Sequence, residues 1–70
     1  MNVRAKTGII IQKDGEYLVG AILGLSCLRW SRSPYAAWIT RRREDAEKVA
    51  KAVGGTRMLF NPIVGQLKMM

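Results

Sequence analysis

The pair Asp14-Gly15 constrains the fold of this 70-residue chain more than any other feature of its sequence. It separates a short β-branched run, Gly8 to Lys13, from a longer apolar run, Glu16 to about Leu25. Runs of this composition are typical of β-strands. Asp-Gly suits a two-residue type I′ turn, because both central residues of that turn need a positive φ. The sequence therefore predicts an antiparallel hairpin with its tip at Asp14-Gly15.

The returning strand of this hairpin is apolar on both of its faces. One face would carry Tyr17, Val19, Ala21, Leu23 and Leu25, and the other Leu18, Gly20, Ile22 and Gly24. A strand with one solvated face alternates apolar with polar residues, so we expect this strand to be covered on both sides. The hydrophobic content of 49% is high for so short a chain, which buries only about 60% of its surface on folding. We therefore expect one cover to be a helix of the same chain and the other a second subunit of a homo-oligomer.

The stretch after the hairpin predicts a third strand that ends before a proline. Cys27 to Ser31 is expected to be this strand, with alternate side chains on opposite faces. Ser33-Pro34 interrupts the pairing, because proline has no N–H to donate to a sheet. Ala36 to Thr40 can resume a short strand or remain a loop packed on Trp38, and the sequence leaves both open.

The second half of the chain predicts one helix and one further strand. Four apolar residues share one helix face because they are spaced i, i+3, i+4 and i+7, namely Ala46, Val49, Ala50 and Val53. The predicted helix runs from about Arg42 to Val53, and Gly54-Gly55 ends it, since glycine adopts the left-handed conformation at low cost. Thr56 to Phe60 is expected to be the last strand, followed by a turn at Asn61-Pro62.

These elements predict an α+β fold in β-β-β-α-β order, a single domain of residues 1–70 with one antiparallel sheet packed on one helix. Residues 1–7 are expected to be a loose lead-in that carries the basic Arg4 and Lys6. Residues 61–70 have two open interpretations, which are an edge strand and an oligomerisation arm that reaches a neighbouring subunit.

The residues from Arg29 to Arg43 combine arginines with aromatic rings and include no acidic residue. They hold five of the seven arginines and both tryptophans. Guanidinium groups match phosphate oxygens with forked donors, and aromatic rings offer flat faces on which a base can stack. The net charge of +7 also favours an anionic partner. The run therefore predicts a ligand that is phosphorylated and contains a base.

The candidate ligand-binding residues are Arg29, Trp30, Ser31, Arg32, Ser33, Tyr35, Thr40, Arg41, Arg42, Arg43 and Arg57. In this prediction the arginines hold phosphates and the hydroxyl groups add further donors. Tyr35 and Trp30 are the candidates to stack on a base. Trp38, Tyr17 and Phe60 are expected to lie in the core, because large aromatic rings bury much surface.

The run Arg41-Arg42-Arg43 stands where the helix is expected to begin. Three cations at a helix N-terminus oppose the helix dipole. A bound phosphate would reverse that penalty, because helix N-termini and arginines both attract anions. Two plainer interpretations are a solvated basic corner and, for Arg43, an ion pair with Glu47 one turn later. The sequence leaves these interpretations open.

The sequence offers no constellation for catalysis, metal binding or a cofactor. It has no histidine, which removes the commonest general base and the commonest metal ligand. Its few acidic residues lack the separation of a paired-carboxylate site, and no phosphate-loop motif is present. We therefore expect a binding protein that is not an enzyme and that holds neither metal nor cofactor.

Compartment signals point to the cytosol. Cys27 is the only cysteine, so no disulfide can form within the chain. The N-terminus lacks the apolar core of a signal peptide. The uncharged run from Tyr17 to Leu28 is shorter than the ~20 residues of a membrane helix. We expect a cytoplasmic protein without a membrane partner.

Three short motifs give the chain a resemblance to phage proteins. They are W-S-x-S-P-Y-x-A-W-x-T-R at Trp30 to Arg41, A-x-x-V-A-x-x-V-G-G at Ala46 to Gly55, and F-N-P-x-x-G at Phe60 to Gly65. In these motifs the chain resembles small orphan proteins carried by phages and prophages. The resemblance implies a setting, since short phage accessory proteins often counter host defence. One such class, similar in size and charge, consists of oligomeric sponge proteins that sequester cyclic or ADP-ribose-derived nucleotide signals without cleaving them.

Three functions remain open at this point, in order of preference. The first is non-catalytic sequestration of an anionic nucleotide immune signal, a cyclic nucleotide or an ADP-ribose derivative, in Arg/aromatic pockets of a homo-oligomer that thereby inhibits host defence. The alternative is a small basic DNA- or RNA-binding protein, which the charge and the interleaved aromatic rings support equally well. A further alternative is a protein inhibitor of a host enzyme, whose acidic groove the basic run would meet.

Overall fold

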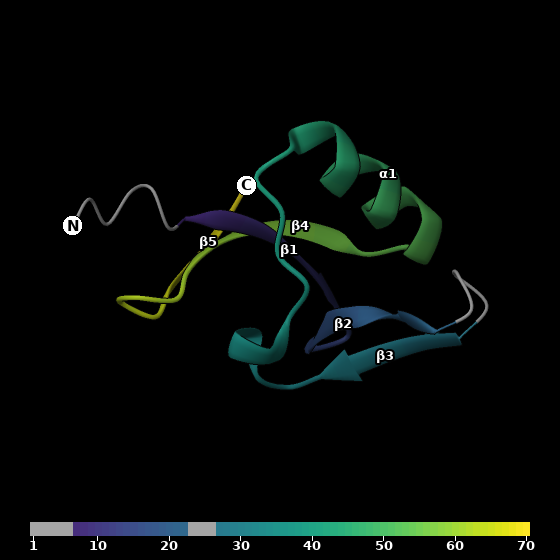
Figure 1. Ribbon diagram of the computed structural model, residues 1–70, viewed down its shortest axis with the longest axis horizontal. Helices are drawn as coiled ribbons and strands as arrows, with labels where there is room; N and C mark the ends of the chain where they lie inside the picture. Colours follow the sequence, from purple (N-terminus) through teal and green to yellow (C-terminus); the bar gives the residue numbers. More distant parts are fainter. Residues whose placement is uncertain (1–6, 23–26) are drawn as a thin grey trace.

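Five strands form one antiparallel sheet in the computed structural model of the protein, which describes residues 7–22 and 27–70 (Figure 1). The elements in chain order are β1 (Gly8–Lys13), β2 (Glu16–Ile22), β3 (Cys27–Ser31), the 3-10 helix η3 (Pro34–Ala36), α1 (Arg43–Val53), β4 (Thr56–Asn61) and β5 (Gln66–Met69). Across the sheet the order is β3-β2-β1-β4-β5. The single helix lies on one face of the sheet, over β1 and β4. This arrangement confirms the predicted α+β class.

The hairpin at Asp14-Gly15 has the predicted geometry. The φ angles are 53° at Asp14 and 78° at Gly15, as a type I′ turn requires. Lys13 pairs with Glu16 directly before and after the turn. β2 is described as far as Ile22, so the predicted extension of this strand to Leu25 lies outside the described residues.

β1 and β2 separate beyond the hairpin, and the chain between η3 and α1 lies between them. The Trp38 N–H donates to the Leu18 carbonyl at 2.8 Å. Thr40 and Ile9 exchange two backbone hydrogen bonds, at 2.7 and 3.0 Å. Thr40 thus forms an isolated bridge with β1, and this segment then runs on to α1 (Figure 1). It satisfies backbone groups of β1 and β2 that the splayed hairpin leaves unpaired.

The core consists of two clusters, one on each face of the sheet. The helix-side cluster is Ile9, Ile11, Leu18, Ala46, Ala50 and Val53, and the opposite cluster is Ile10, Tyr17, Met58 and Phe60. Tyr17 and Leu18 are neighbours in β2 yet belong to different clusters, because successive side chains of a strand point to opposite faces. Their own chain therefore covers both faces of β2 at this point. Homo-oligomer formation stays a prediction. At Tyr17 and Leu18, however, a second subunit is not needed to cover either face of β2.

Helix α1 begins one residue later than predicted and ends where predicted. Arg42 is its N-cap residue and offers no side-chain hydrogen bond. Gly54 ends the helix with a φ of 71°, the left-handed conformation expected of a C-terminal glycine. The Lys13 ammonium donates to the Val53 carbonyl at 3.1 Å, so a cation from β1 complements the negative end of the helix dipole.

The last two strands form a hairpin, and its second strand is the edge of the sheet. β4 continues through Asn61, one residue beyond the prediction, and the turn occupies residues 62–65. The Asn61 side-chain oxygen accepts from the Ile63 N–H at 3.0 Å, while the Asn61 carbonyl accepts from the Gly65 N–H at 2.8 Å. β5 then pairs with β4, as the edge-strand interpretation of residues 61–70 expects, while contact of this segment with a neighbouring subunit stays a prediction.

Gly65 and Gly15 offer a matched test of the two hairpin turns. Both have a positive φ, 68° and 78°, so alanine at either site should cost about 1–2 kcal/mol. A Cβ at Gly65 would also lie 2.7 Å from the Tyr35 hydroxyl oxygen, whereas nothing lies within 4 Å of one at Gly15. We expect Gly65→Ala to lower the urea midpoint more than Gly15→Ala does. In a Tyr35→Phe background the difference should disappear, and its persistence would contradict this account.

Candidate functional site

The predicted ligand-binding residues do not converge on one pocket, because the sheet separates them. In β3, Trp30 pairs with Leu18 and packs against the helix-side cluster. Ser31 pairs with Tyr17, which belongs to the opposite cluster. Arg29, two residues before Ser31, is exposed and pairs with Gly20 across a register shift in β2. The side chains of adjacent residues in β3 therefore lie on opposite faces of the sheet, as the sequence predicted.

Tyr35 lies on the face opposite the helix. Its ring meets Phe60 edge to face, with centroids 5.1 Å apart and an interplanar angle of 85°. Its side chain is still 64% exposed, so the predicted stacking residue is accessible. The sheet stands between it and the helix, and this ring therefore cannot share a pocket within one chain with groups at the helix N-terminus.

Both tryptophans are half-buried and pack against the helix-side cluster. This placement agrees with the core role expected of Trp38. Trp30 lines a hollow of about 240 Å³ together with Leu28, Lys13 and the two acidic residues of the hairpin, Asp14 and Glu16. Two carboxylates beside the ring make this hollow unfavourable for a phosphate. Trp30 thus lines a hollow with acidic residues, whereas the sequence predicted that it would lie among arginines.

Arg41, Arg42 and Arg43, here called the arginine corner, are exposed at the start of α1. Arg42 and Arg43 line a hollow of about 320 Å³ with Glu44. The expected pair between Arg43 and Glu47 does not form, because Glu47 pairs with Lys51 at 3.3 Å instead. Lys51 follows Glu47 by one helical turn and complements the dipole at the C-terminal end. Within residues 7–22 and 27–70, the arginine corner makes no ion pair.

The predicted hydroxyl donors take part in local turns. Ser31 Oγ accepts from the Ser33 N–H at 3.1 Å, and Thr40 Oγ1 accepts from the Arg42 N–H at 3.2 Å. Side-chain oxygens of serine and threonine commonly stabilise turns in this way. The Thr40 contact fixes the backbone as it enters the arginine corner. Ser33 and Arg32 are exposed next to η3.

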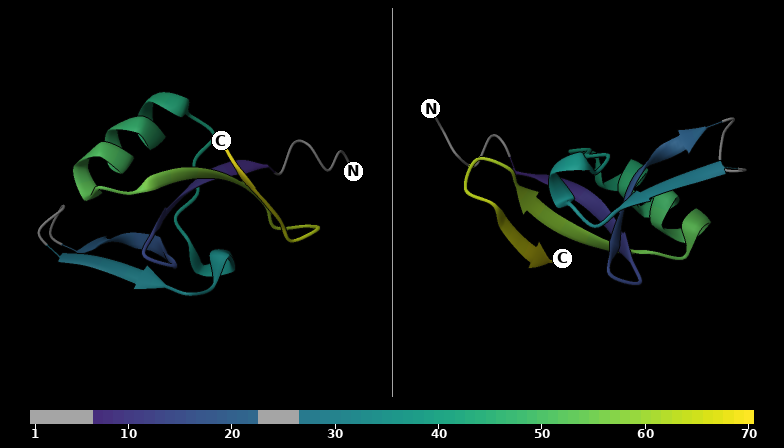
Figure 2. Two further views of the ribbon diagram at one scale, coloured as in Figure 1. Left: turned by 180° about the vertical axis from the view of Figure 1, so that it is seen from behind. Right: turned by 90° about the horizontal axis from the view of Figure 1, so that it is seen from below.

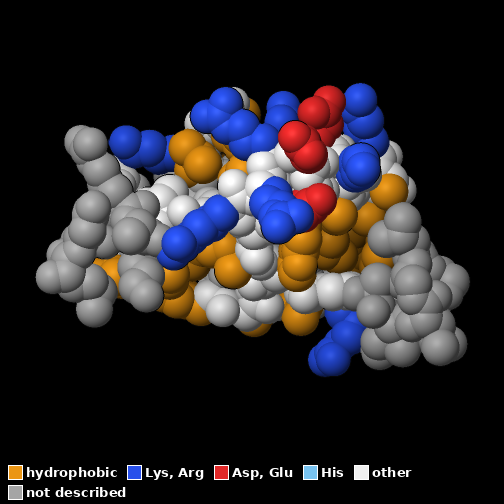
Figure 3. All heavy atoms as spheres, turned by 45° about the horizontal axis from the view of Figure 1, so that its top comes forward, with side chains coloured by type: hydrophobic (Ala, Val, Ile, Leu, Met, Phe, Trp, Pro, Cys, Tyr) orange, Lys and Arg blue, Asp and Glu red, His pale blue; other side chains and the backbone are white. Residues whose placement is uncertain are grey.

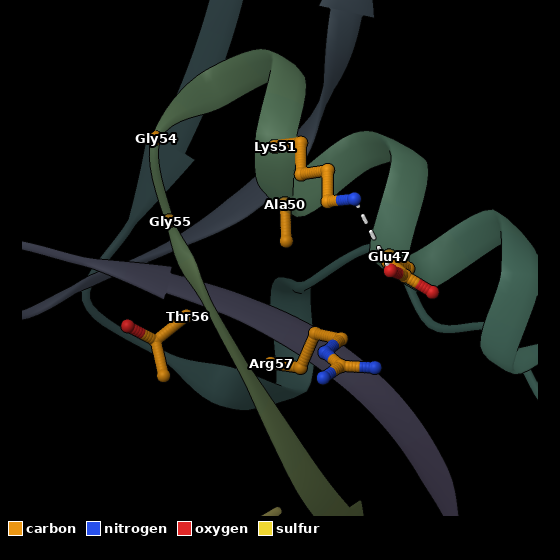
Figure 4. Close-up of a pocket in the computed structure, with 7 residues that line it drawn as sticks. All are labelled: Glu47, Ala50, Lys51, Gly54, Gly55, Thr56 and Arg57. Atoms are coloured by element: carbon orange, nitrogen blue, oxygen red, sulfur yellow. Dashed lines mark ion pairs between the residues drawn. The ribbon is translucent and has the colours of Figure 1, made fainter.

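A hollow larger than the one at the arginine corner lies between α1 and β4, and Arg57 is the only predicted ligand-binding residue among those that line it (Figure 4). It has a volume of about 440 Å³ and is lined by Glu47, Ala50, Lys51, Gly54, Gly55, Thr56 and Arg57. Arg57 pairs with Ile11 in the sheet and so points to the helix side. Its guanidinium lies beside the Glu47–Lys51 pair, whereas Thr56 points away (Figure 4). The spacing of Glu47 and Lys51 indicated a helical ion pair, but no local signal placed that pair over β4.

The helix face of the molecule carries most of the described positive charge. The residues involved, here called the helix-side basic surface, are Arg41, Arg42, Arg43, Lys48, Lys51, Arg57 and Lys68. Figure 3 shows this face, with basic side chains in blue spread around a small group of acidic ones in red. Positive charge is thus distributed over a broad exposed area rather than directed into one cavity.

Comparison with protein-family models, with curated proteins and with solved structures finds no match for this chain. Within the described part of the chain, no helix combines the length and the apolar character needed to cross a membrane. Any functional conclusion therefore rests on the residues themselves.

Proposed function

We propose that this chain is a non-catalytic binding protein for nucleic acid, which it contacts through the helix-side basic surface. The observation that supports this most is the arginine corner, where three exposed guanidinium groups lack an acidic partner among the described residues. Arginines in this state can each take a phosphate without first breaking an ion pair. Phosphate contacts release counterions from a nucleic acid, and that release supplies most of the affinity of sequence-independent binding.

The distribution of the charges favours a long ligand over a small one. Lys68 in β5 and Lys51 in α1 belong to the same broad surface as the arginine corner. A mononucleotide could reach only a few of these groups, whereas a strand of nucleic acid can contact many of them along its backbone. The sheet separates Tyr35 from the arginine corner, which also argues against a compact nucleotide pocket within one chain. We therefore rank nucleic acid above the small nucleotide signal that the sequence alone favoured.

Sequestration of a nucleotide immune signal is the second candidate. It is favoured by the 320 Å³ hollow at the arginine corner, where α1 begins without a side-chain cap. Free amides at a helix N-terminus and two arginines suit a single phosphate group. A second subunit would have to complete the pocket with a stacking ring. In either case the setting we propose is that of a phage accessory protein in the cytoplasm of the host.

A titration with labelled oligonucleotides of increasing length, at several salt concentrations, tests the proposal. Each phosphate contact contributes about −0.9 to the slope of log affinity against log salt concentration for duplex DNA. If the arginine corner contacts three phosphates, this slope should be about −2.7 or more negative. Affinity should rise with length. A thermal-shift panel of cyclic dinucleotides and ADP-ribose isomers tests the second candidate, for which ligand at 100 times Kd adds about 2.7 kcal/mol of stability. Binding of one host protein, with no response in either assay, would support the inhibitor alternative and reject both candidates.

A further inference from the structure

Strand β5 leaves one long side of its backbone without a partner among the described strands. It is the last strand in the order β3-β2-β1-β4-β5 and pairs only with β4. Figure 2 shows it at the outer rim of the sheet. An edge strand presents unpaired N–H and C=O groups that can pair with another strand. Folded proteins usually blunt such an edge with charges or proline, and β5 carries one charge, on Lys68.

Exposed apolar side chains flank this edge at both ends. Ile63 and Val64, in the turn before β5, are 47% and 58% exposed. Met69 and Met70, at its other end, are 77% and 45% exposed. These four residues are most of the large apolar side chains that the described part of the chain exposes. Their position at the two ends of one short strand is the feature that points to a partner.

We propose that β5 pairs antiparallel with β5 of a second copy of this chain. Residues opposite each other in a strand pair share a face, so a symmetric register must centre on one residue. Centred on Leu67, the register places Gln66 opposite Lys68 of the partner subunit and Gly65 opposite Met69 of the partner subunit. Centred on Lys68, it would place two like charges directly opposite each other, which is destabilising. Of the two central residues of β5, Leu67 is therefore the favoured centre of the register.

The two-fold symmetry explains why apolar groups stand at both ends of β5. An antiparallel pair brings the turn of one copy to the strand end of the other, so Ile63 and Val64 meet Met69 and Met70 of the partner subunit. The strand is only four residues long, so we expect a reversible dimer with a Kd in roughly the micromolar range.

This dimer would extend the helix-side basic surface. An antiparallel pair keeps equivalent faces on the same side, so both helices would lie on one face of a ten-stranded sheet. The two helices would be about 19 Å apart, from four strand spacings of about 4.8 Å. The pairing does not depend on any ligand, so it can be tested in the absence of nucleic acid and independently of the proposed function.

Cysteine cross-linking tests the register directly. In a Cys27→Ser background, Gln66→Cys and Lys68→Cys place thiols at two exposed positions. Opposed residues have Cα atoms about 4.5–5.5 Å apart, within the range for a disulfide. Positions 66 and 66 of two copies would be diagonal neighbours, about 7–8 Å apart and too distant. We expect oxidation of an equimolar mixture to give mainly the mixed dimer. Equal cross-linking in each variant alone would overturn the register.

Sedimentation velocity tests the association itself. We expect the wild-type chain to change from monomer to dimer between about 1 µM and about 1 mM. Met70→Lys should weaken the association at least about tenfold, because this register places Met70 opposite Val64 of the partner subunit, and a charge in that apolar contact must be desolvated. Ala52→Lys, which adds the same charge at an exposed position of α1, should leave it unchanged. Circular dichroism checks that both variants fold. A monomer at about 1 mM, or equal effects of both substitutions, would overturn the proposal.

Discussion

We expect the replacement of Arg41, Arg42 and Arg43 together with glutamine to weaken the proposed binding of nucleic acid by roughly 10- to 100-fold near physiological salt. The change would remove three proposed phosphate contacts, and glutamine in place of Arg43, the first residue of α1, is also a good helix former. The slope of log affinity against log salt should become less negative by about 2.7 for duplex DNA, since each contact contributes about 0.9. Fluorescence anisotropy with one oligonucleotide at four salt concentrations measures both quantities.

The matched control for this experiment is Arg29→Gln with Arg32→Gln. Both arginines are exposed and neither belongs to the helix-side basic surface. The control lowers the net charge by two, so a general effect of charge would reduce affinity in proportion. An equal loss per arginine in the two variants would contradict a defined surface and indicate that the whole molecule attracts the polymer. A full loss in the control alone would place the ligand at Arg29 and Arg32 instead of at the arginine corner.

Phe60→Ala will remove a large part of the stability of the fold. The side chain is 2% exposed and belongs to the cluster opposite the helix. Truncating a buried phenylalanine costs about 3–5 kcal/mol, because packing is lost and a cavity remains. A domain of this size has a total stability of only about 4–10 kcal/mol. Urea unfolding followed by tryptophan fluorescence should show a much lower midpoint or a chain that is already unfolded.

Ile63→Ala, measured at a protein concentration at which the chain is monomeric, is the control for this truncation. Ile63 is 47% exposed in the nearby turn, and its truncation should change stability by less than about 0.5 kcal/mol. If both variants lose the same stability, Phe60 does not occupy the second core cluster. If Phe60→Ala unfolds completely, Phe60→Leu provides a measurable intermediate, with a smaller loss expected from partial refilling of the site.

The strands and the helix were predictable because their signals are local. Asp14-Gly15 fixes a turn by the chemistry of two residues, and Gly54 ends α1 in the same way. The order of the strands and the splay between β1 and β2 were not predicted. Thr40 lies beside Ile9 only because the chain returns there from η3, and no local pattern in either residue signals that contact.

The sequence predicted which residue types the candidate site contains, but it did not predict how those residues are arranged in space. The run from Arg29 to Arg43 is continuous in the sequence, but in β3 its side chains alternate between the two faces of the sheet. After η3 the chain bonds to β2 and then to β1 before it enters α1. A run of one composition therefore became two groups on opposite sides of a sheet. Arg57 was predicted from its charge alone. Its neighbours in the hollow between α1 and β4, Glu47 and Lys51, were recognisable in the sequence only as a pair one helical turn apart.

The pairing of β1 has a consequence for the order in which the chain can fold. β1 pairs with β2 at two positions, Gln12 and Lys13, but with β4 at five. An isolated hairpin of this kind is marginal in water, so the N-terminal strand must wait for a partner more than forty residues later. Closing so long a loop costs entropy before any contact repays it, which slows folding and makes it cooperative. We expect the three consecutive isoleucines of β1 to stay exposed until β4 and α1 pack on them, and we expect the chain to be most prone to aggregate during that interval.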